Sequence, residues 1–259
     1  MVAKNNKALG QHWLKNREIL DEIADEASAL DFAEKCVEIG PGLGTLTSSL
    51  LKRFKSVTAV EFDARLAENL PKSFPGKNLE VINADILKFD FSTIKEPYVV
   101  VGNIPYYITS PIIEKVLSVS NLPKRVVLLM QKEVAERILD EKESGLSLFV
   151  KNRADVEPGI LVPKEEFTPP PKVDSAVLIM TPHAPKYDDE LFKFIRLAFV
   201  SPRKKLMHNL APLKSKDELV KIFEELGISV DARPADLHLD TYFALFKIGR
   251  HTSELQSRI

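Results

Sequence analysis

The sequence predicts a doubly wound α/β domain with a mainly parallel sheet, followed by a small domain built only of helices. Two observations lead to this prediction. Over the first two thirds of the chain, short apolar runs alternate with segments of helical periodicity, and the runs are apolar on both faces, like strands of a covered parallel sheet. Over the last third, only helical periodicity remains.

The elements of the expected sheet follow one another in a regular order. Strands are expected at 36–40, 57–62, 79–85, 98–103 and 125–131. Helices are expected at 17–30, 45–54, 64–70, 110–119 and 133–139. Two further extended runs, 146–162 and 172–180, have no full helix between them, so we expect an antiparallel hairpin at one edge of the sheet.

The stretch TPHAPK (181–186) contains two prolines and predicts a linker. Beyond it, helical periodicity is found at 190–200, 204–213, 216–227 and 234–248. We therefore expect two domains, the sheet domain at 1–182 and an all-helical domain at 186–259.

Composition excludes several classes of protein. The chain has 259 residues, of which 44% are hydrophobic, and this supplies enough apolar surface for a core. No run approaches the ~20 apolar residues of a membrane span, and the N-terminus lacks the apolar core of a secretion signal. The single cysteine, Cys36, excludes an intramolecular disulfide, and the five histidines lack metal-ligand spacing. We expect a cytoplasmic protein without a metal site or membrane contact.

The formal net charge of −1 is not that of a protein with a general affinity for polyanions, so any nucleic-acid binding must be local. Two basic segments are candidates. The first comprises Lys4, Lys7, Lys15 and Arg17, and the second Arg196, Arg203, Lys204 and Lys205. Either one alone is equally typical of an ordinary solvated surface.

In doubly wound sheets, ligands bind beyond the carboxyl ends of the strands. The first expected strand ends in EIGPGLGT (Glu38 to Thr45), whose glycines allow a sharp turn close to a ligand. The spacing differs from the GxGxxG of dinucleotide-binding proteins, and no Lys-Ser/Thr pair follows to form a phosphate-binding loop. A glycine turn can also serve merely to reverse the chain.

Acidic residues end the next two strands. Glu61 is placed to accept hydrogen bonds from the two hydroxyls of a ribose, and Asp85 from an adenine amine. Each has an alternative role, Glu61 as a charge at a helix N-terminus and Asp85 as a turn residue. The combination of glycine turn and two acids, without a lysine to neutralise phosphate, favours S-adenosylmethionine over a dinucleotide.

The fourth strand ends in NIPY. The side-chain oxygen of Asn103 and the carbonyl of Ile104, held rigid by Pro105, are suited to accept the two hydrogens of an adenine amine and so free its lone pair for attack on a methylsulfonium. Tyr106 is suited to stack on the extruded base, and we expect Tyr107 to pack in the protein. A rigid turn with a core tyrosine is the alternative interpretation.

Taken in order along nearly the whole chain, the motifs resemble those of the small-subunit rRNA adenine dimethyltransferase family, the KsgA type. They are KALGQHWL, EIGPGLGTLT, VEFD, NADIL, GNIPYYITSPII, QKEVAERI, FTPPPKVDSAV, AFVSPRKKL and RPADLHLDTYFAL. Two positions and one segment depart from the family pattern, the segment being SGLSLFV (144–150), which lacks the tyrosine and arginine that usually precede this strand. Trp13 stands where phenylalanine is usual, and Pro202 where arginine is usual.

The resemblance implies a Rossmann-like fold of the S-adenosylmethionine-dependent methyltransferase type. It implies contacts with this cosubstrate for His12, Leu14, Gly40, Gly42, Glu61, Asp85 and Asn103. It implies catalytic roles for Asn103, Ile104, Pro105 and Tyr106, with Phe167 on the opposite face of the target base. It also implies that the helical domain, with Arg203, Lys204 and Lys205, contacts rRNA.

The implied activity is the dimethylation of two adjacent adenines in a hairpin loop near the 3′ end of small-subunit rRNA. The implied partner is the immature small ribosomal subunit, and a monomer is expected. One alternative is an erythromycin-resistance-type methyltransferase, which shares the NIPY-type motif but modifies large-subunit rRNA. Another is a binding protein that kept the fold, namely a ribosome-assembly or transcription factor.

Overall fold

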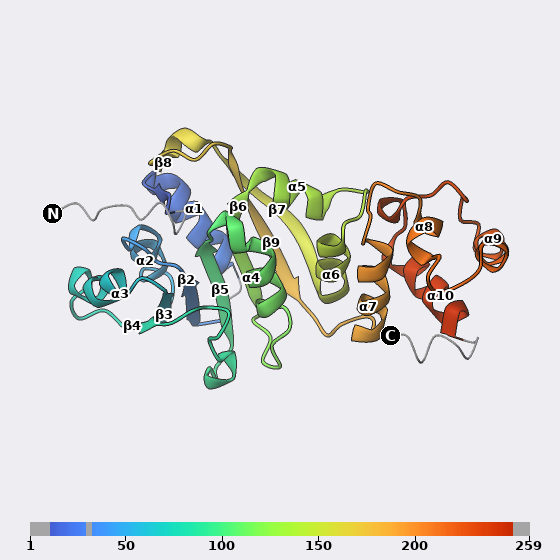
Figure 1. The fold of residues 1–259 in the computed structure, drawn as a ribbon. Helices are drawn as coiled ribbons and strands as arrows, with labels where there is room; N and C mark the ends of the chain where they lie inside the picture. Colours follow the sequence, from blue (N-terminus) through green and yellow to red (C-terminus); the bar gives the residue numbers. More distant parts are fainter. Residues whose placement is uncertain (1–10, 30–32, 251–259) are drawn as a thin grey trace. The chain divides into compact units, whose positions relative to one another are not determined.

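The computed structural model of the protein describes residues 11–29 and 33–250, and the chain divides into two compact units (Figure 1). The first consists of Met1–Glu136 and Ala154–His183, and the second of Arg137–Arg153 and Ala184–Ile259. Residues 137–153, which the sequence analysis placed in the first domain, pack within the second. They are tied to it by hydrogen bonds from the Glu143 N–H to the Ala235 carbonyl (2.9 Å) and from Asn152 Nδ2 to the Tyr187 carbonyl (3.0 Å).

A seven-stranded sheet with the order β4-β3-β2-β5-β6-β9-β7 forms the centre of the first unit. Its strands are β2 (Lys35–Ile39), β3 (Ser56–Glu61), β4 (Leu79–Asn83), β5 (Tyr98–Asn103), β6 (Arg125–Gln131), β7 (Ala154–Val162) and β9 (Ser175–Pro182). Strands β2 to β6 are parallel, and β9 and β7 add an antiparallel hairpin at one edge. The predicted doubly wound, mainly parallel sheet is confirmed.

The order of the strands places a topological switch point between β2 and β5. From β2 the chain proceeds outward through β3 and β4 and then returns to place β5 on the other side of β2. The loops after β2 and β5 therefore leave the sheet in opposite directions, and a crevice forms between them at the carboxyl ends of these strands.

Helices cover the sheet, and in Figure 1 α4 lies in front of it. The helices of this unit are α1 (Arg17–Ser28), α2 (Thr45–Leu50), α3 (Ala64–Asn69), α4 (Thr109–Val116) and α5, assigned to Lys132–Leu139 at the border of the two units. Asn16 caps the start of helix α1, because its side chain accepts hydrogen bonds from the N–H groups of Glu18 and Ile19. Its buried face joins α2 and alternate residues of the strands in one apolar core.

Short elements complete the first unit. Single 3-10 turns are η2 (Leu70–Ser73), η3 (Phe91–Thr93), η4 (Tyr106–Ile108) and η5 (Lys164–Glu166). A separate two-stranded antiparallel ribbon joins β1 (Trp13–Leu14), in the N-terminal arm, to β8 (Phe167–Thr168). This ribbon holds the arm against the segment that the sequence analysis associated with the target base.

The expected strand at 146–162 is wrong in its first half, where the chain forms helix α6 (Gly145–Arg153). The strand was predicted because α6 buries apolar residues on several sides and therefore lacks the amphipathic pattern of a surface helix. Its start has a recognisable signal, because the Ser144 hydroxyl accepts a hydrogen bond from the Ser147 N–H (3.0 Å), as an N-cap residue does.

The described part of the second unit is helical, which confirms the prediction of an all-helical C-terminal region. Besides α6 it contains α7 (Asp189–Ala198), α8 (Leu206–Leu210), α9 (Lys216–Glu225), the 3-10 turn η6 (Pro234–Asp236) and α10 (Leu239–Arg250). Helix α9 begins with a capping box formed by Ser215 and Glu218. The buried Tyr242 ring packs beside Phe194, and its hydroxyl donates to the Pro234 carbonyl (2.8 Å).

Among residues 11–29 and 33–250, no helix is long and apolar enough to cross a membrane. The same residues contain no group of three or more histidine, cysteine, aspartate or glutamate side chains arranged to hold a metal ion.

Candidate active site

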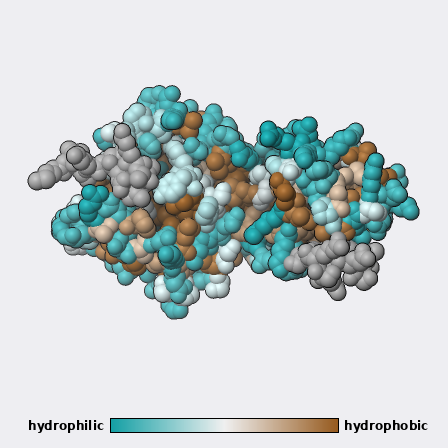
Figure 2. Space-filling view, in the orientation of Figure 1, coloured by the Kyte–Doolittle hydropathy of each residue, from teal (hydrophilic) through white to brown (hydrophobic). Residues whose placement is uncertain are grey.

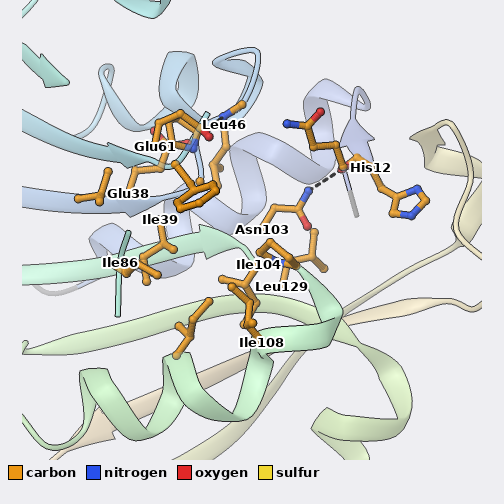
Figure 3. A pocket seen from close by; sticks show the side chains of 18 of the residues that line it. His12, Glu38, Ile39, Leu46, Glu61, Ile86, Asn103, Ile104, Ile108 and Leu129 are labelled. Carbon is orange, nitrogen blue, oxygen red and sulfur yellow. Dashed lines mark hydrogen bonds between the residues drawn. The ribbon is translucent and has the colours of Figure 1, made fainter. Parts of the chain in front are cut away.

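A cavity of about 290 Å³ lies in the first unit, where the residues that follow β2, β3, β4 and β5 meet the N-terminal arm. The structure brings together most of the predicted site residues, namely His12, Leu14, Gly40, Gly42, Glu61, Asp85, Asn103, Ile104, Pro105 and Tyr106. In Figure 2 apolar side chains are visible in a hollow of this unit, close to where Figure 1 shows α1 and β5. Figure 3 shows the cavity from close by.

The glycine turn after β2 requires glycine for its backbone conformation. Gly40 and Gly42 have φ angles of +63° and +57°, in the left-handed region that side chains with a Cβ rarely adopt. A Cβ added to Gly42 would lie 3.2 Å from the indole nitrogen of Trp13. The arm therefore lies directly over the turn, and the main chain of the turn is open to the cavity.

The Glu61 carboxylate is fixed by two main-chain donors. Its Oε2 accepts from the Gly42 N–H (3.0 Å) and its Oε1 from the Asp63 N–H (2.8 Å), and the residue is 6% exposed. Burial raises the pKa of Glu61, and the two N–H donors oppose this rise. Because a carboxylate has about four lone-pair sites, Glu61 keeps acceptor capacity toward the cavity for a ribose hydroxyl.

Asp85 is a turn residue and also lines the cavity. Its Oδ1 accepts from the Leu87 N–H (3.0 Å), as in a turn, and the residue lines the cavity beyond β4. It is half-buried, so its second oxygen remains suited to accept from an adenine amine.

The Asn103 amide has a defined orientation. Its Nδ2 donates to the main-chain carbonyl of His12 (3.0 Å; Figure 3), so its Oδ1 is left as an acceptor. The next residue is also held, because the Ile104 N–H donates to the Leu129 carbonyl (3.1 Å). The arm therefore decides which way the amide of Asn103 faces.

The two adjacent tyrosines have opposite environments. The Tyr106 hydroxyl lies 2.7 Å from Ser175 Oγ, and burial raises the pKa of this phenol. Tyr107 is 62% exposed and lines the cavity, so the expectation that it packs in the protein is wrong. A single 3-10 turn rotates successive side chains by roughly 120°, so the two rings differ in burial although both border the cavity.

Phe167 is buried away from the cavity, and its contact with the target base stays a prediction. It is 2% exposed and belongs to the apolar core, and in the ribbon it is the register partner of Leu14. It does not line the cavity. The physical reason is the pairing of β8 with β1, which directs this ring into the core.

Glu38 is a cavity residue whose role the sequence analysis did not consider. It is 1% exposed, and its Oε2 accepts from the Thr47 hydroxyl (2.6 Å). Burial raises the pKa of Glu38 to about 8, and the nearby Glu61 carboxylate adds to the rise. Its position immediately before the glycine turn is the sequence feature that could have identified Glu38 as a cavity residue.

The C-terminal basic residues also lie together. A shallow depression on the second unit is lined by Arg203, Lys204, Lys205, His208, Asp231 and Arg233, which we call the basic depression. Lys205 forms an ion pair with Asp231, and Lys204 Nζ lies 3.0 Å from His208 Nε2. His208 and Arg233 were not among the predicted residues.

The arm is a weaker candidate for nucleic-acid binding, because Arg17 is engaged with α2 through Ser48 Oγ (2.6 Å) and Ser49 Oγ (3.0 Å). Lys4 and Lys7 lie outside the described residues.

The sheet order, the cavity at its switch point and the acids beyond β3 and β4 define an S-adenosylmethionine-dependent methyltransferase. The comparison with known families is more specific. The chain belongs to the ribosomal RNA adenine dimethylase family, whose model matches residues 2–250.

Individual relatives agree with this assignment. The chain is 38% identical to ribosomal RNA small subunit methyltransferase A of Fusobacterium nucleatum, over 96% of this chain and 98% of that protein. Among solved structures it is similar to a dimethyladenosine transferase from Plasmodium falciparum (30% identity, TM-score 0.77, 93% and 98% of the two chains). It is also similar to the 23S rRNA methyltransferase ErmE (28% identity, TM-score 0.72, 91% and 98%).

We expect Glu61→Gln to weaken S-adenosylmethionine binding about 10- to 100-fold, because hydrogen bonds to a charged acceptor contribute about 1.5–3 kcal/mol. An amide nitrogen also cannot accept from the Gly42 or Asp63 N–H groups. Equilibrium dialysis with labelled S-adenosylmethionine measures the effect. The control is Glu80→Gln, which changes an exposed glutamate of β4 outside the cavity. Equal affinities of the parent and Glu61→Gln would exclude Glu61 from the cosubstrate site.

Proposed function

We propose that this protein dimethylates two adjacent adenines in a hairpin loop near the 3′ end of small-subunit rRNA. We infer that it acts in the cytoplasm, as a monomer, on the immature small ribosomal subunit. The observation that carries the proposal is the Asn103 amide, which the His12 carbonyl orients so that its oxygen remains an acceptor at the carboxyl end of β5.

The chemistry required of the protein is to make a poor nucleophile reactive. The lone pair of an adenine amine is delocalised into the ring. Hydrogen bonds from the amine to Asn103 Oδ1 and to the Ile104 carbonyl favour a tetrahedral nitrogen and so localise the lone pair. S-Adenosylmethionine supplies the electrophilic methyl group. The proton leaves the nitrogen after transfer, when it is strongly acidic, so no residue has to act as a strong base.

Two alternative functions can be distinguished from the proposed one. An enzyme acting on large-subunit rRNA is supported by the similarity to ErmE, but identity to the small-subunit methyltransferase is higher, 38% against 28%. A binding protein without activity is disfavoured because Glu61, Asp85 and Asn103 meet in one cavity.

The test is incubation with labelled S-adenosylmethionine and unmethylated small subunits, with large subunits in parallel, followed by nucleoside analysis of each RNA. Dimethyladenosine confined to the small subunit is the expected result. Label in the large subunit would support the resistance-type activity instead. No label in either RNA, with cosubstrate binding intact, would leave the assembly factor as the better explanation.

We propose that the basic depression contacts rRNA phosphates. Each phosphate contact contributes about 0.7–0.9 to the slope of log K against log salt concentration, so replacing Arg203, Lys204 and Lys205 by alanine is expected to reduce that slope by roughly 2. Lys205 should contribute least, because Asp231 pairs with it. Filter binding of small subunits across a salt series measures the slope. Lys216→Ala with Lys221→Ala, two exposed positions on α9, is the control. An unchanged slope in the triple variant would place the RNA surface elsewhere.

A further inference from the structure

We propose that Ser175 is a positioning residue for the proposed reaction, and that its hydroxyl fixes the ring of Tyr106 for stacking on the target adenine. This inference rests on the proposed function and extends it to a residue beyond the lining of the cavity. Tyr106 borders the cavity, whereas Ser175 lies behind it at the start of β9.

Ser175 carries a buried hydroxyl at the start of an otherwise apolar strand. It is 0% exposed, and the residues that follow it, from Ala176 to Met180, are buried and apolar. A buried hydroxyl costs free energy unless it is hydrogen-bonded. Within the described residues, the hydrogen-bond partner of the Ser175 side chain is the Tyr106 hydroxyl, 2.7 Å away. The contact with Tyr106 therefore accounts for a polar group that the packing of the sheet does not require.

The main chain around Ser175 is fixed on both sides. Ser175 has register partners in β6 and in β7, the two strands that flank β9. The preceding residue, Asp174, accepts from the Lys132 N–H through its carbonyl (3.1 Å) and from the Lys164 N–H through its Oδ1 (3.1 Å). The Ser175 hydroxyl is thus attached to a rigid part of the sheet.

Tyr106 is held at both ends. In η4 the Ile108 N–H donates to the Pro105 carbonyl (3.2 Å), and the Thr109 hydroxyl donates to the Tyr106 carbonyl (3.2 Å). The phenol is held at the other end by Ser175. Burial raises the pKa of this phenol above its ordinary value of about 10, so the hydroxyl keeps its proton at neutral pH. A ring that is already fixed loses little freedom when a base stacks on it, and this lowers the entropic cost of binding.

A fixed ring matters most between the two transfers to one adenine. After the first transfer the base carries one methyl group, and the second transfer requires the same amine to be presented again. If the stacking ring moves freely, the singly methylated base leaves more often before the second transfer. Loss of the Ser175 hydroxyl should therefore increase the proportion of monomethyladenosine among the products.

The experiment compares Ser175→Ala, Tyr106→Phe and the double variant with the parent in kcat/KM for small subunits at saturating S-adenosylmethionine. Each single variant loses one neutral hydrogen bond, so each should lower kcat/KM about 2- to 10-fold. The double variant loses the same bond, so its loss should equal that of a single variant rather than the product of the two. Nucleoside analysis should show more monomethyladenosine, and equilibrium dialysis should show unchanged cosubstrate affinity.

The control is Thr58→Val, which removes another buried hydroxyl of the same sheet. Thr58 is 3% exposed, its hydroxyl donates to Glu80 (3.2 Å), and it does not line the cavity. This variant should match the parent in kcat/KM and in the ratio of the two products. If it loses as much as Ser175→Ala, the effect belongs to the stability of the sheet, and the assignment is overturned.

Three further results would also overturn the assignment. The first is a Ser175→Ala variant equal to the parent. The second is a double variant whose loss is the product of the single losses, because the two hydroxyls would then act independently. The third is a fall in cosubstrate affinity parallel to that in kcat/KM, because the cavity itself would then have changed. A parent that forms no dimethyladenosine in small subunits refutes the proposed function and this inference with it, whereas an active parent with an unaffected Ser175→Ala refutes the inference alone.

Discussion

Asn103→Ala is expected to lower the rate of methyl transfer by about 10²- to 10³-fold, the loss seen when one preorganised hydrogen-bonding group is removed from a transition state. The amide oxygen acts on the amine only as its lone pair becomes localised, so the loss belongs to kcat. S-Adenosylmethionine affinity should change little, since Glu61 and Asp85 remain.

Single-turnover transfer from labelled S-adenosylmethionine to small subunits measures the rate directly. The matched control is Asn78→Ala, because Asn78 also donates to a main-chain carbonyl, that of Lys55 (2.8 Å), but does not line the cavity. Equal turnover in Asn103→Ala and the parent would refute the proposed role of this amide.

Glu38→Gln is expected to remove a pH dependence of stability that the parent shows between pH 4.5 and about 8. Burial raises the pKa of this carboxyl from 4.5 to about 8, which corresponds to an upper limit of about 5 kcal/mol in the free energy of unfolding. The glutamine is an uncharged side chain of similar shape, and its carbonyl can still accept from the Thr47 hydroxyl.

The sign of this pH dependence of stability follows from the uptake of a proton on folding. In this pH range the unfolded chain has an ionised Glu38 and the folded chain a protonated one, so folding binds a proton. The contribution of Glu38 to stability is complete below pH 4.5 and is lost as the pH rises through about 8. Glu61, whose pKa is also raised, acts in the same direction, so the difference between variant and parent isolates Glu38.

Urea unfolding of parent and variant at pH 5, 6, 7 and 8 measures this difference. Glu38→Gln should gain stability relative to the parent as the pH rises. The control is Glu34→Gln, which makes the same chemical change at an exposed residue paired with Lys55, where an effect below about 1 kcal/mol is expected. A difference between parent and Glu38→Gln that does not vary with pH would show that Glu38 ionises freely in the folded protein.

Much of the site was predictable because parallel strands impose their own geometry. Once the apolar runs were assigned to neighbouring parallel strands, the residues following them had to meet at one edge of the sheet. That reasoning located the glycine turn, Glu61, Asp85 and Asn103 at one site without knowledge of any distance. It needed only the period of the pattern and the position of each residue relative to the end of a strand.

Prediction from the sequence failed where a local pattern is compatible with two structures. The segment Gly145–Arg153 is apolar on several sides, and such a segment is buried equally well as a strand or as a helix. Its assignment to the second unit depends on hydrogen bonds to residues more than thirty positions away. No pattern within the segment itself contains that information.

The sequence by itself therefore determined the class of fold and the residues that meet at the carboxyl ends of the parallel strands, namely the glycine turn, the two acids and NIPY. The tertiary structure alone decided which aromatic rings border the cavity, and Tyr106 does whereas Phe167 does not. Phe167 is buried because β8 pairs with the arm strand, where it lies opposite the buried Leu14. The side chains of a strand alternate between its two faces, and the face that becomes core is chosen by the partner strand, which here is about 150 residues distant in the chain.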